Sequence, residues 1–136
     1  MKDVDRAYLA GIIDGEGSIM LIRSHVNKFP SPCVSIASAS LELLDWTKMV
    51  TGIGSIKSKK NYHPERHLAS YTYTARYRDV LTILQMISPY LVIEKKKKRA
   101  QFILENYEKV TKRNGRYSYN ELMAKHAFYN NFMKIG

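Results

Sequence analysis

LAGIIDGEG, residues 9–17, is the stretch that decides the fold of this 136-residue chain. It closes a short helix that we expect over about residues 5–14, and the glycines that follow then end that helix. Asp3 or Asp5 is expected to cap the N-terminus of the helix and to complement its dipole.

Small residues on this helix predict close packing against another helix. Ala7, Ala10 and Gly11 lie on or near one helical face. Small side chains let two helix backbones approach until they touch. The partner helix belongs either to the same chain or to a second copy across a two-fold axis.

Two carboxylates, Asp14 and Glu16, end the helix, where its dipole disfavours negative charge. Binding a cation would explain them. Gly15 and Gly17 leave a backbone carbonyl free to turn toward the same ion, and hard oxygen ligands of this kind suit Mg²⁺. The alternative is a helix that ends in a glycine turn with solvated acids.

The composition is that of a globular domain with a polyanionic partner. Hydrophobic residues make up 45% of the chain, and 22 Lys and Arg outnumber 12 Asp and Glu, for a net charge of +10. Nucleic acid is therefore the default partner, and a ribosome-bound or merely soluble basic protein is the alternative. The single cysteine excludes a disulfide framework. Without an apolar run or secretory signal, we expect no membrane association and an intracellular, reducing compartment.

Periodicity and turn residues divide the rest of the chain. Four strands are expected, at residues 18–27, 33–38, 55–60 and 67–77. The further helices are expected from residue 41, capped by Ser40, to a break at 52–54, then at 79–87, 95–110 and about 118–134. Ser118 and Glu121 form the capping box of the last helix. Pro30 and Pro32 forbid regular structure in a turn at 27–32.

This order predicts an α+β fold with an antiparallel sheet, followed by C-terminal helices. No low-complexity linker interrupts the chain. We therefore expect one domain over residues 1–136, with a core at about 3–110 and a helical extension at about 111–136.

Residues 9–17 resemble the signature of the LAGLIDADG homing endonucleases, with Ile12 for Leu, Gly15 for Ala and Glu16 for Asp. The basic charge, the length and the α-β-β-α-β-β-α order agree with this resemblance up to about residue 110. The family resemblance implies a saddle of four antiparallel strands that lies in the DNA major groove.

The motif occurs once, so the resemblance implies a homodimer on a nearly palindromic DNA target. The residues expected at the dimer interface are Ala7, Ala10, Gly11 and Asp14.

The implied activity is that of an intron-encoded type of endonuclease, which hydrolyses both DNA strands and leaves short 3′ overhangs. Glu16 maps onto the metal-binding catalytic acid of the family, and the carbonyl of Gly15 commonly joins it. Asp14 maps onto an acid whose role is mainly structural. Two Glu16 carboxylates in the dimer would hold Mg²⁺, for which Mn²⁺ or Ca²⁺ substitutes, and the ions would activate water.

A catalytic lysine follows a proline-aromatic-leucine turn in the family. Residues 88–91 and 100–101 match its landmarks and select Lys96, with Lys95 or Lys97 as register alternatives. A cation there would lie near the scissile phosphates and order the attacking water. A basic helix start that touches phosphate nonspecifically is the alternative.

Two further catalytic positions follow from the resemblance. Ser38 stands where the family often has a glutamine, and Arg76 is the candidate for a helping arginine. The stretch at 37–40 is bland, which leaves a damaged or slow enzyme open as an alternative.

Strands in a major groove contact bases with alternate side chains, and Val34 and Ile36 are expected to point to the core instead. The expected DNA-binding residues are Arg23, Ser24, His25, Asn27, Lys28, Cys33, Ser35, Ser55, Lys57, Lys59, His67, Tyr71 and Tyr73, with Lys60, Arg66, Lys112, Arg113 and Arg116 on phosphates. A solvated strand face is the alternative for any one of them.

Two other functions are compatible with the same fold. One is a maturase, a splicing cofactor that binds intron RNA, and the other is a DNA-binding protein without cleavage activity. The acid at position 16 favours the endonuclease.

Overall fold

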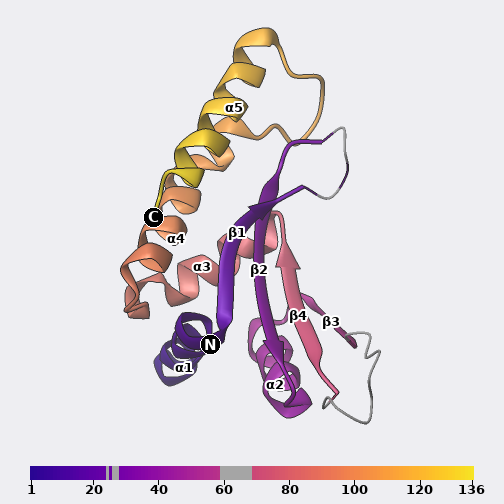
Figure 1. The fold of residues 1–136 in the computed structure, drawn as a ribbon, viewed down its shortest axis with the longest axis vertical. Coiled ribbons are helices and arrows are strands. Elements are labelled where there is room, and N and C mark those ends of the chain that lie inside the picture. The colour runs from indigo at the N-terminus through magenta and orange to yellow at the C-terminus, as the bar shows by residue number, and fades with distance from the viewer. Residues whose placement is uncertain (24, 26–27, 59–68) are drawn as a thin grey trace.

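The structure, a computed structural model, describes residues 1–23, 25, 28–58 and 69–136. Figure 1 shows its elements. The strands are β1 (Gly17–Ile22), β2 (Ser31–Ser38), β3 (Ser55–Ser58) and β4 (Tyr71–Arg76). The helices are α1 (Asp3–Glu16), α2 (Leu41–Thr51), α3 (Arg78–Ile87), α4 (Glu94–Asn106) and α5 (Tyr119–Met133), with 3₁₀ helices η1 (Ser88–Tyr90) and η2 (Glu108–Val110).

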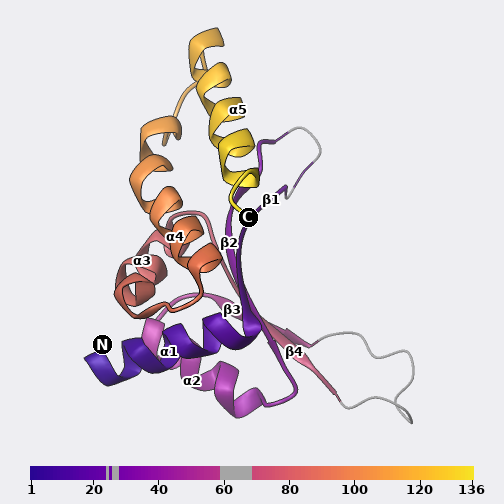
Figure 2. The ribbon, with the colours of Figure 1, turned by 60° about the vertical axis from the view of Figure 1, so that its left-hand side comes forward.

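The four strands form one antiparallel sheet in the order β1-β2-β4-β3. Helices α1 to α4 contact these strands and gather on one side of the sheet (Figure 2). The predicted α+β fold with a four-stranded antiparallel sheet is therefore confirmed.

The core lies between the sheet and the helices. Ile19, Val34, Ile36 and Tyr73 are fully buried on the helix side, as the alternation of strand side chains requires. On α3, the predicted apolar positions 80, 83, 84 and 87 are all at most 1% exposed. The 3.6-residue period of that helix therefore predicted its buried face correctly.

The C-terminal helix shares this core. The predicted capping box begins α5: the Ser118 hydroxyl accepts from the Glu121 N–H at 3.2 Å, and Glu121 Oε1 accepts from the Ser118 N–H at 2.8 Å. Phe128 then stacks on Phe102 of α4, with ring centroids 5.3 Å apart, so α5 lies along α4 (Figure 1).

Two expectations about element ends are wrong. Neither Asp3 nor Asp5 caps α1, because the N-cap position is Lys2; both acids lie in the first helical turn, where they complement the dipole. Pro32 lies in β2 rather than in a turn. It pairs with Leu21, and its carbonyl accepts from the Tyr77 N–H at 3.1 Å, so the strand continues without needing an N–H from the proline.

Other boundaries differ less. β1 ends at Ile22 rather than near residue 27, and α4 ends at Asn106 before the short η2. Within the described ranges, no helix has both the length and the apolar character needed to cross a bilayer.

Tyr73 joins the end of α2 to the sheet. Its hydroxyl donates to the Ile53 carbonyl at 2.8 Å and lies 3.1 Å from the Thr51 hydroxyl. Gly54 has a φ of +92°, and a Cβ there would come within 2.5 Å of the tyrosine ring. Only glycine therefore fits beside this buried ring.

We predict that Tyr73→Phe lowers the free energy of unfolding by about 0.5–1.5 kcal/mol, because it removes the hydrogen bond to the Ile53 carbonyl and leaves that carbonyl only the Thr51 hydroxyl at 3.1 Å. Urea denaturation measures this loss. Thr72→Ala, one position away on the opposite face of β4, is the control and should change stability by less than about 0.5 kcal/mol. Wild-type stability of Tyr73→Phe would contradict the role of its hydrogen bond to the Ile53 carbonyl.

Candidate active site and nucleic-acid interface

The end of α1 passes directly into β1 through a close backbone contact. A Cβ on Gly17 would lie 2.8 Å from the Ile13 Cα, so no other residue fits there without a shift. The Gly17 N–H still donates to the Ile13 carbonyl. Glu16 is therefore the last helical residue, held at a fixed point beside the first strand.

The Glu16 side chain is exposed and accepts no hydrogen bond from any residue that the structure describes. It also forms no ion pair with a described residue. A carboxylate at a helix C-terminus is disfavoured by the dipole, and here nothing in the described chain compensates it. Its arrangement suits an acid whose partner is an external cation.

Asp14 has the opposite character. Its two carboxylate oxygens accept from the backbone N–H groups of Val92 at 2.8 Å and Ile93 at 3.2 Å. These two residues directly precede α4, so Asp14 ties the end of α1 to the start of that helix. The expected structural role of Asp14 agrees with this geometry.

Lys96 completes the junction from the other side. Its Nζ donates to the carbonyls of Ile13 at 2.7 Å and Asp14 at 2.6 Å. These carbonyls belong to the last turn of α1, where helical partners run out. Of the candidate lysines, Lys96 is the one placed at the motif helix, whereas Lys95 and Lys97 are exposed. The Lys96 ammonium thus binds the backbone at Asp14, two positions before Glu16 in the chain.

A divalent cation would find an incomplete ligand set in one chain. No group of three or more His, Cys, Asp or Glu side chains gathers anywhere in the described ranges. Glu16 offers one free carboxylate, and Gly15 is exposed with open space where a side chain would be. Oxygen donors of this kind fit Mg²⁺, but the remaining ligands must come from outside the chain.

Ser38 lies at the same end of the sheet as Glu16, whereas Arg76 lies away from it. The Ser38 hydroxyl accepts from the Ser40 N–H at 3.0 Å within its own turn, at the sheet end where β1 begins. Arg76 lies at the other end of β4, opposite Cys33 of β2. Arg76 pairs with Cys33, and Gly17 pairs with Ile36. These two positions on β2 are three residues apart, which is roughly 10 Å along the strand.

The face of the sheet that the helices leave uncovered is called the open face below. Its residues, assigned from the register, are Ser18, Met20 and Ile22 on β1, Ser31, Cys33, Ser35 and Ala37 on β2, Thr72, Thr74 and Arg76 on β4, and Ser55 and Lys57 on β3. One row crosses all four strands as Ser18, Ser35, Thr74 and Ser55, so four hydroxyl groups lie side by side.

Tyr71 and Tyr73 were predicted to face DNA, and this is wrong. Tyr73 is fully buried on the helix side, and the half-buried Tyr71 shares that side and packs on the core. Thr72 and Thr74 take their place on the open face. The sequence contained the information needed to assign the faces. Ala75 shares the face of the two tyrosines, whereas the charged Arg76 shares the face of the two threonines, and a charged residue favours the exposed face.

Cys33 lies on the open face but is only 1% exposed, so its predicted contact with DNA is also wrong. Its register neighbours are Met20 and Arg76, whose longer side chains flank it on both sides. Burial raises the pKa of the Cys33 thiol, which keeps it protonated and unreactive.

The other expected DNA contacts divide into four groups. One consists of Lys112, Arg113 and Arg116, which are exposed in the segment before α5. Ser35, Ser55 and Lys57 lie on the open face, and sequence reasoning missed Ser18 beside them. The exposed Arg23, His25 and Lys28 lie beyond the end of β1. Six predicted contacts lie outside the described residues: Ser24, Asn27, Lys59, Lys60, Arg66 and His67.

The exposed side of α1 carries small and apolar residues at helical spacing, namely Val4, Ala7, Tyr8, Gly11 and Gly15. Ala10 was expected on this side, but it is 0% exposed because it packs into the core of its own chain. Ala10 is therefore not available to a second copy, and the Asp14 carboxylate is likewise used within its own chain.

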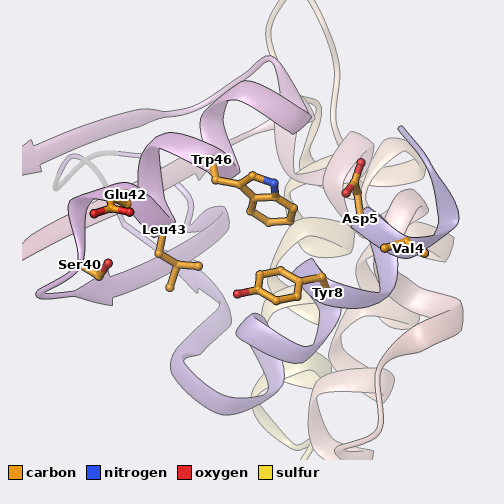
Figure 3. A pocket seen from close by; sticks show the side chains of 7 residues that line it. All are labelled: Val4, Asp5, Tyr8, Ser40, Glu42, Leu43 and Trp46. Carbon is orange, nitrogen blue, oxygen red and sulfur yellow. The ribbon is translucent and has the colours of Figure 1, made fainter.

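A groove of about 550 Å³ runs beside that side of α1, between α1 and α2. Figure 3 shows Tyr8 and Trp46 facing one another across it, with their ring centroids 4.9 Å apart in a T-shaped arrangement. Asp5 and Glu42 also line the groove. The exposed apolar surface therefore extends from α1 onto α2.

Solved structures show what fold this is, although neither a protein-family model nor a curated protein sequence matches the chain. The homing endonuclease I-CvuI, in complex with uncleaved I-CreI target DNA and magnesium, is 18% identical, with a TM-score of 0.76 over 98% of this chain and 82% of that chain. The archaeal intron-encoded homing endonuclease I-Vdi141I, complexed with DNA, is 19% identical, with a TM-score of 0.56 over 94% and 98% of the two chains.

A third structure carries the family name. The LAGLIDADG homing endonuclease I-GzeII, in complex with its DNA target, is 19% identical, with a TM-score of 0.64 over 96% of this chain and 43% of that chain. The chain therefore has the fold of the LAGLIDADG homing endonucleases, as residues 9–17 predicted.

We predict that Asp14→Ala lowers the free energy of unfolding by about 1–3 kcal/mol, since it removes the two hydrogen bonds that the Asp14 carboxylate accepts from backbone N–H groups at the start of α4. Glu16→Gln, at an exposed carboxylate two residues away, should leave it within about 0.5 kcal/mol. Urea denaturation of both variants measures the difference. If Glu16→Gln is the more destabilised of the two, the assignment of structural and free acids is reversed.

Proposed function

We propose that the protein is a site-specific, metal-dependent DNA endonuclease that acts as a homodimer on a long pseudo-palindromic duplex and leaves 3′ overhangs. The observation that carries this proposal is the end of α1. There a free carboxylate, Glu16, lies beside glycines and next to a lysine that the backbone holds in place.

Charge and the open face support DNA as the substrate. The chain carries a net charge of +10, which favours a polyanion. Hydroxyl groups both donate and accept hydrogen bonds, so the row of Ser18, Ser35, Thr74 and Ser55 suits the mixed edges of bases in a major groove. Lys57 adds a cation on the same face.

The exposed side of α1 supports a homodimer. Small residues there allow two copies of α1 to approach closely, and the Tyr8–Trp46 groove extends the apolar surface beside them. A two-fold axis along paired α1 helices would bring two Glu16 carboxylates together. The second copy then supplies an acid that one chain lacks, and a symmetric dimer favours a nearly palindromic site.

Glu16 and a neighbouring carbonyl such as that of Gly15 would hold the divalent cation, and Mg²⁺ supplies activation of water and stabilisation of the leaving oxygen. The Lys96 ammonium has three N–H donors, of which two are used by the Ile13 and Asp14 carbonyls. The third remains for a phosphate oxygen. Because the backbone already fixes this cation, it stabilises developing charge without reorganising.

A DNA-binding protein without cleavage activity is the second candidate. The observation that favours it is the Ser38 hydroxyl, which accepts from the Ser40 N–H within its own turn, so that one of its two lone pairs is already used and less of the group remains for a water molecule. A maturase would use the same basic face for intron RNA. Cleavage of DNA separates both from the endonuclease.

We predict that the protein with Mg²⁺ cuts a subset of a randomised duplex library, and that Glu16→Gln abolishes cutting while duplex binding stays within about twofold. Sequencing of the cut ends identifies both target and overhang. Glu105→Gln, at an exposed carboxylate of α4, is the matched control and should cut normally. Normal cutting by Glu16→Gln would refute the role of this acid.

We predict that Gly11→Arg converts the dimer into a monomer. No atom lies within 4 Å of where a Gly11 side chain begins, so the single chain tolerates the arginine, whereas paired α1 helices do not. Sedimentation velocity at micromolar concentration measures the mass. Gln85→Arg, at an exposed position of α3, is the control. A dimer that persists in Gly11→Arg would place the interface elsewhere.

A further inference from the structure

A second cavity lies at the far end of the sheet from the start of β1. It has a volume of about 570 Å³ and lies between the start of β2, the β4–α3 turn and the segment that leads into α5. Its lining includes five cations, Lys28, Arg78, Lys112, Arg113 and Lys125. No carboxylate lines it among the residues that the structure describes.

Two of these five cations form ion pairs with carboxylates of the same chain. Arg78 Nε and Glu108 Oε1 are 3.2 Å apart, and Lys112 Nζ and Glu121 Oε1 are 3.0 Å apart. Lys28, Arg113 and Lys125 have no carboxylate partner within the described residues. The cavity therefore carries an excess of about three positive charges that the described residues do not balance.

Lys125 is the unusual member of this set, because it is only 8% exposed. Its Nζ donates to the Thr111 hydroxyl at 2.9 Å and lies 5.4 Å and 5.6 Å from the ring centroids of Tyr107 and Tyr117. These contacts occupy one N–H donor and leave two. Burial, and then the nearby Arg78 charge, lower the pKa of Lys125. The charged ammonium is therefore disfavoured in this position, and a bound anion would stabilise it.

Tyr77 lines the same cavity and has a strained backbone. Its φ of 56° is the only positive value at a non-glycine residue in the described ranges, and its ψ of −133° lies outside the left-handed helical region. Such a conformation costs on the order of 1–3 kcal/mol and persists where the surrounding structure enforces it, often at binding sites. The side chain is 44% exposed, so its hydroxyl is available to a ligand.

We propose that this cavity is an anion site that takes a phosphate group, with Lys125 as its buried cation and Tyr77 as a neutral donor at its mouth. Tyr77 directly follows Arg76, which lies in a row of the open face with Met20 and Cys33, near the end of the sheet at which β4 ends. A duplex that lies along the open face therefore reaches the cavity with its backbone. The identification of the DNA backbone as the source of the phosphate group rests on the proposed function. Binding of free phosphate to the cavity does not.

The test uses Lys125→Met, which removes the charge but keeps a flexible side chain of similar length, so that folding is retained. Tyr77→Phe removes only the hydroxyl. Lys48→Met, at an exposed lysine on α2, is the matched control. Inorganic phosphate is titrated by calorimetry, and binding of a mixed-sequence duplex is measured over a range of salt concentrations.

We expect Lys125→Met to weaken phosphate binding about tenfold or more, with Tyr77→Phe intermediate and Lys48→Met unchanged. In the duplex arm, Lys125→Met should reduce the slope of log affinity against log salt by about one phosphate contact. A changed slope identifies the DNA backbone as the source. A changed phosphate affinity with an unchanged slope identifies free phosphate.

Lys125→Met and the control behaving alike in both arms would overturn the proposal. Failure of the proposed function is recognised separately, as a wild-type protein that neither binds nor cuts duplex DNA. The phosphate titration still decides the anion site in that case.

Discussion

The junction between α1 and α4 positions the whole candidate active site, because two charged side chains bind backbone groups of the opposite element there. The Asp14 carboxylate accepts from the N–H groups that precede α4, and the Lys96 ammonium donates to the carbonyls that end α1. Each charge thus binds backbone groups at a helix end, and the Ile13 carbonyl accepts from both the Gly17 N–H and the Lys96 ammonium. α1 cannot slide or turn without breaking these bonds, so Glu16 and Lys96 keep a fixed relation to one another.

The same junction sets the register of the sheet. β1 begins one residue after Glu16, and Gly17 pairs with Ile36, which in turn pairs with the buried Tyr73. Since a slip of one residue would exchange the two faces of a strand, the tyrosine and its hydrogen bonds to the end of α2 hold the small hydroxyl residues on the open face. The surface offered to a duplex is therefore shallow and polar, with cations concentrated beyond its ends.

The sequence predicted those features that depend on local pattern. The period of α3, the capping box of α5 and the antiparallel order of four strands all followed from the spacing of apolar, hydroxyl and glycine residues. The faces of β4 did not follow, because tyrosine and threonine alternate there and both favour strands. The burial of Ala10 and Cys33 depends on neighbours that are distant in sequence, and so do the strain at Tyr77 and the pairing of Asp14 with residues 92 and 93.

The two sites differ in what one chain can do alone. The proposed phosphate cavity draws its cations and tyrosines from a single chain, whereas the proposed metal site would draw one free carboxylate from it and would need a second copy or substrate oxygens for the rest. Binding to a DNA backbone would then begin with the monomer, and cutting would begin only once two copies share a target. The proposed phosphate cavity around Lys125 would contact the DNA backbone away from the phosphodiester bonds that are cut. It would therefore favour correct placement of each copy before the two Glu16 carboxylates meet. In such a protein, affinity for DNA and the rate of cleavage would depend differently on protein concentration.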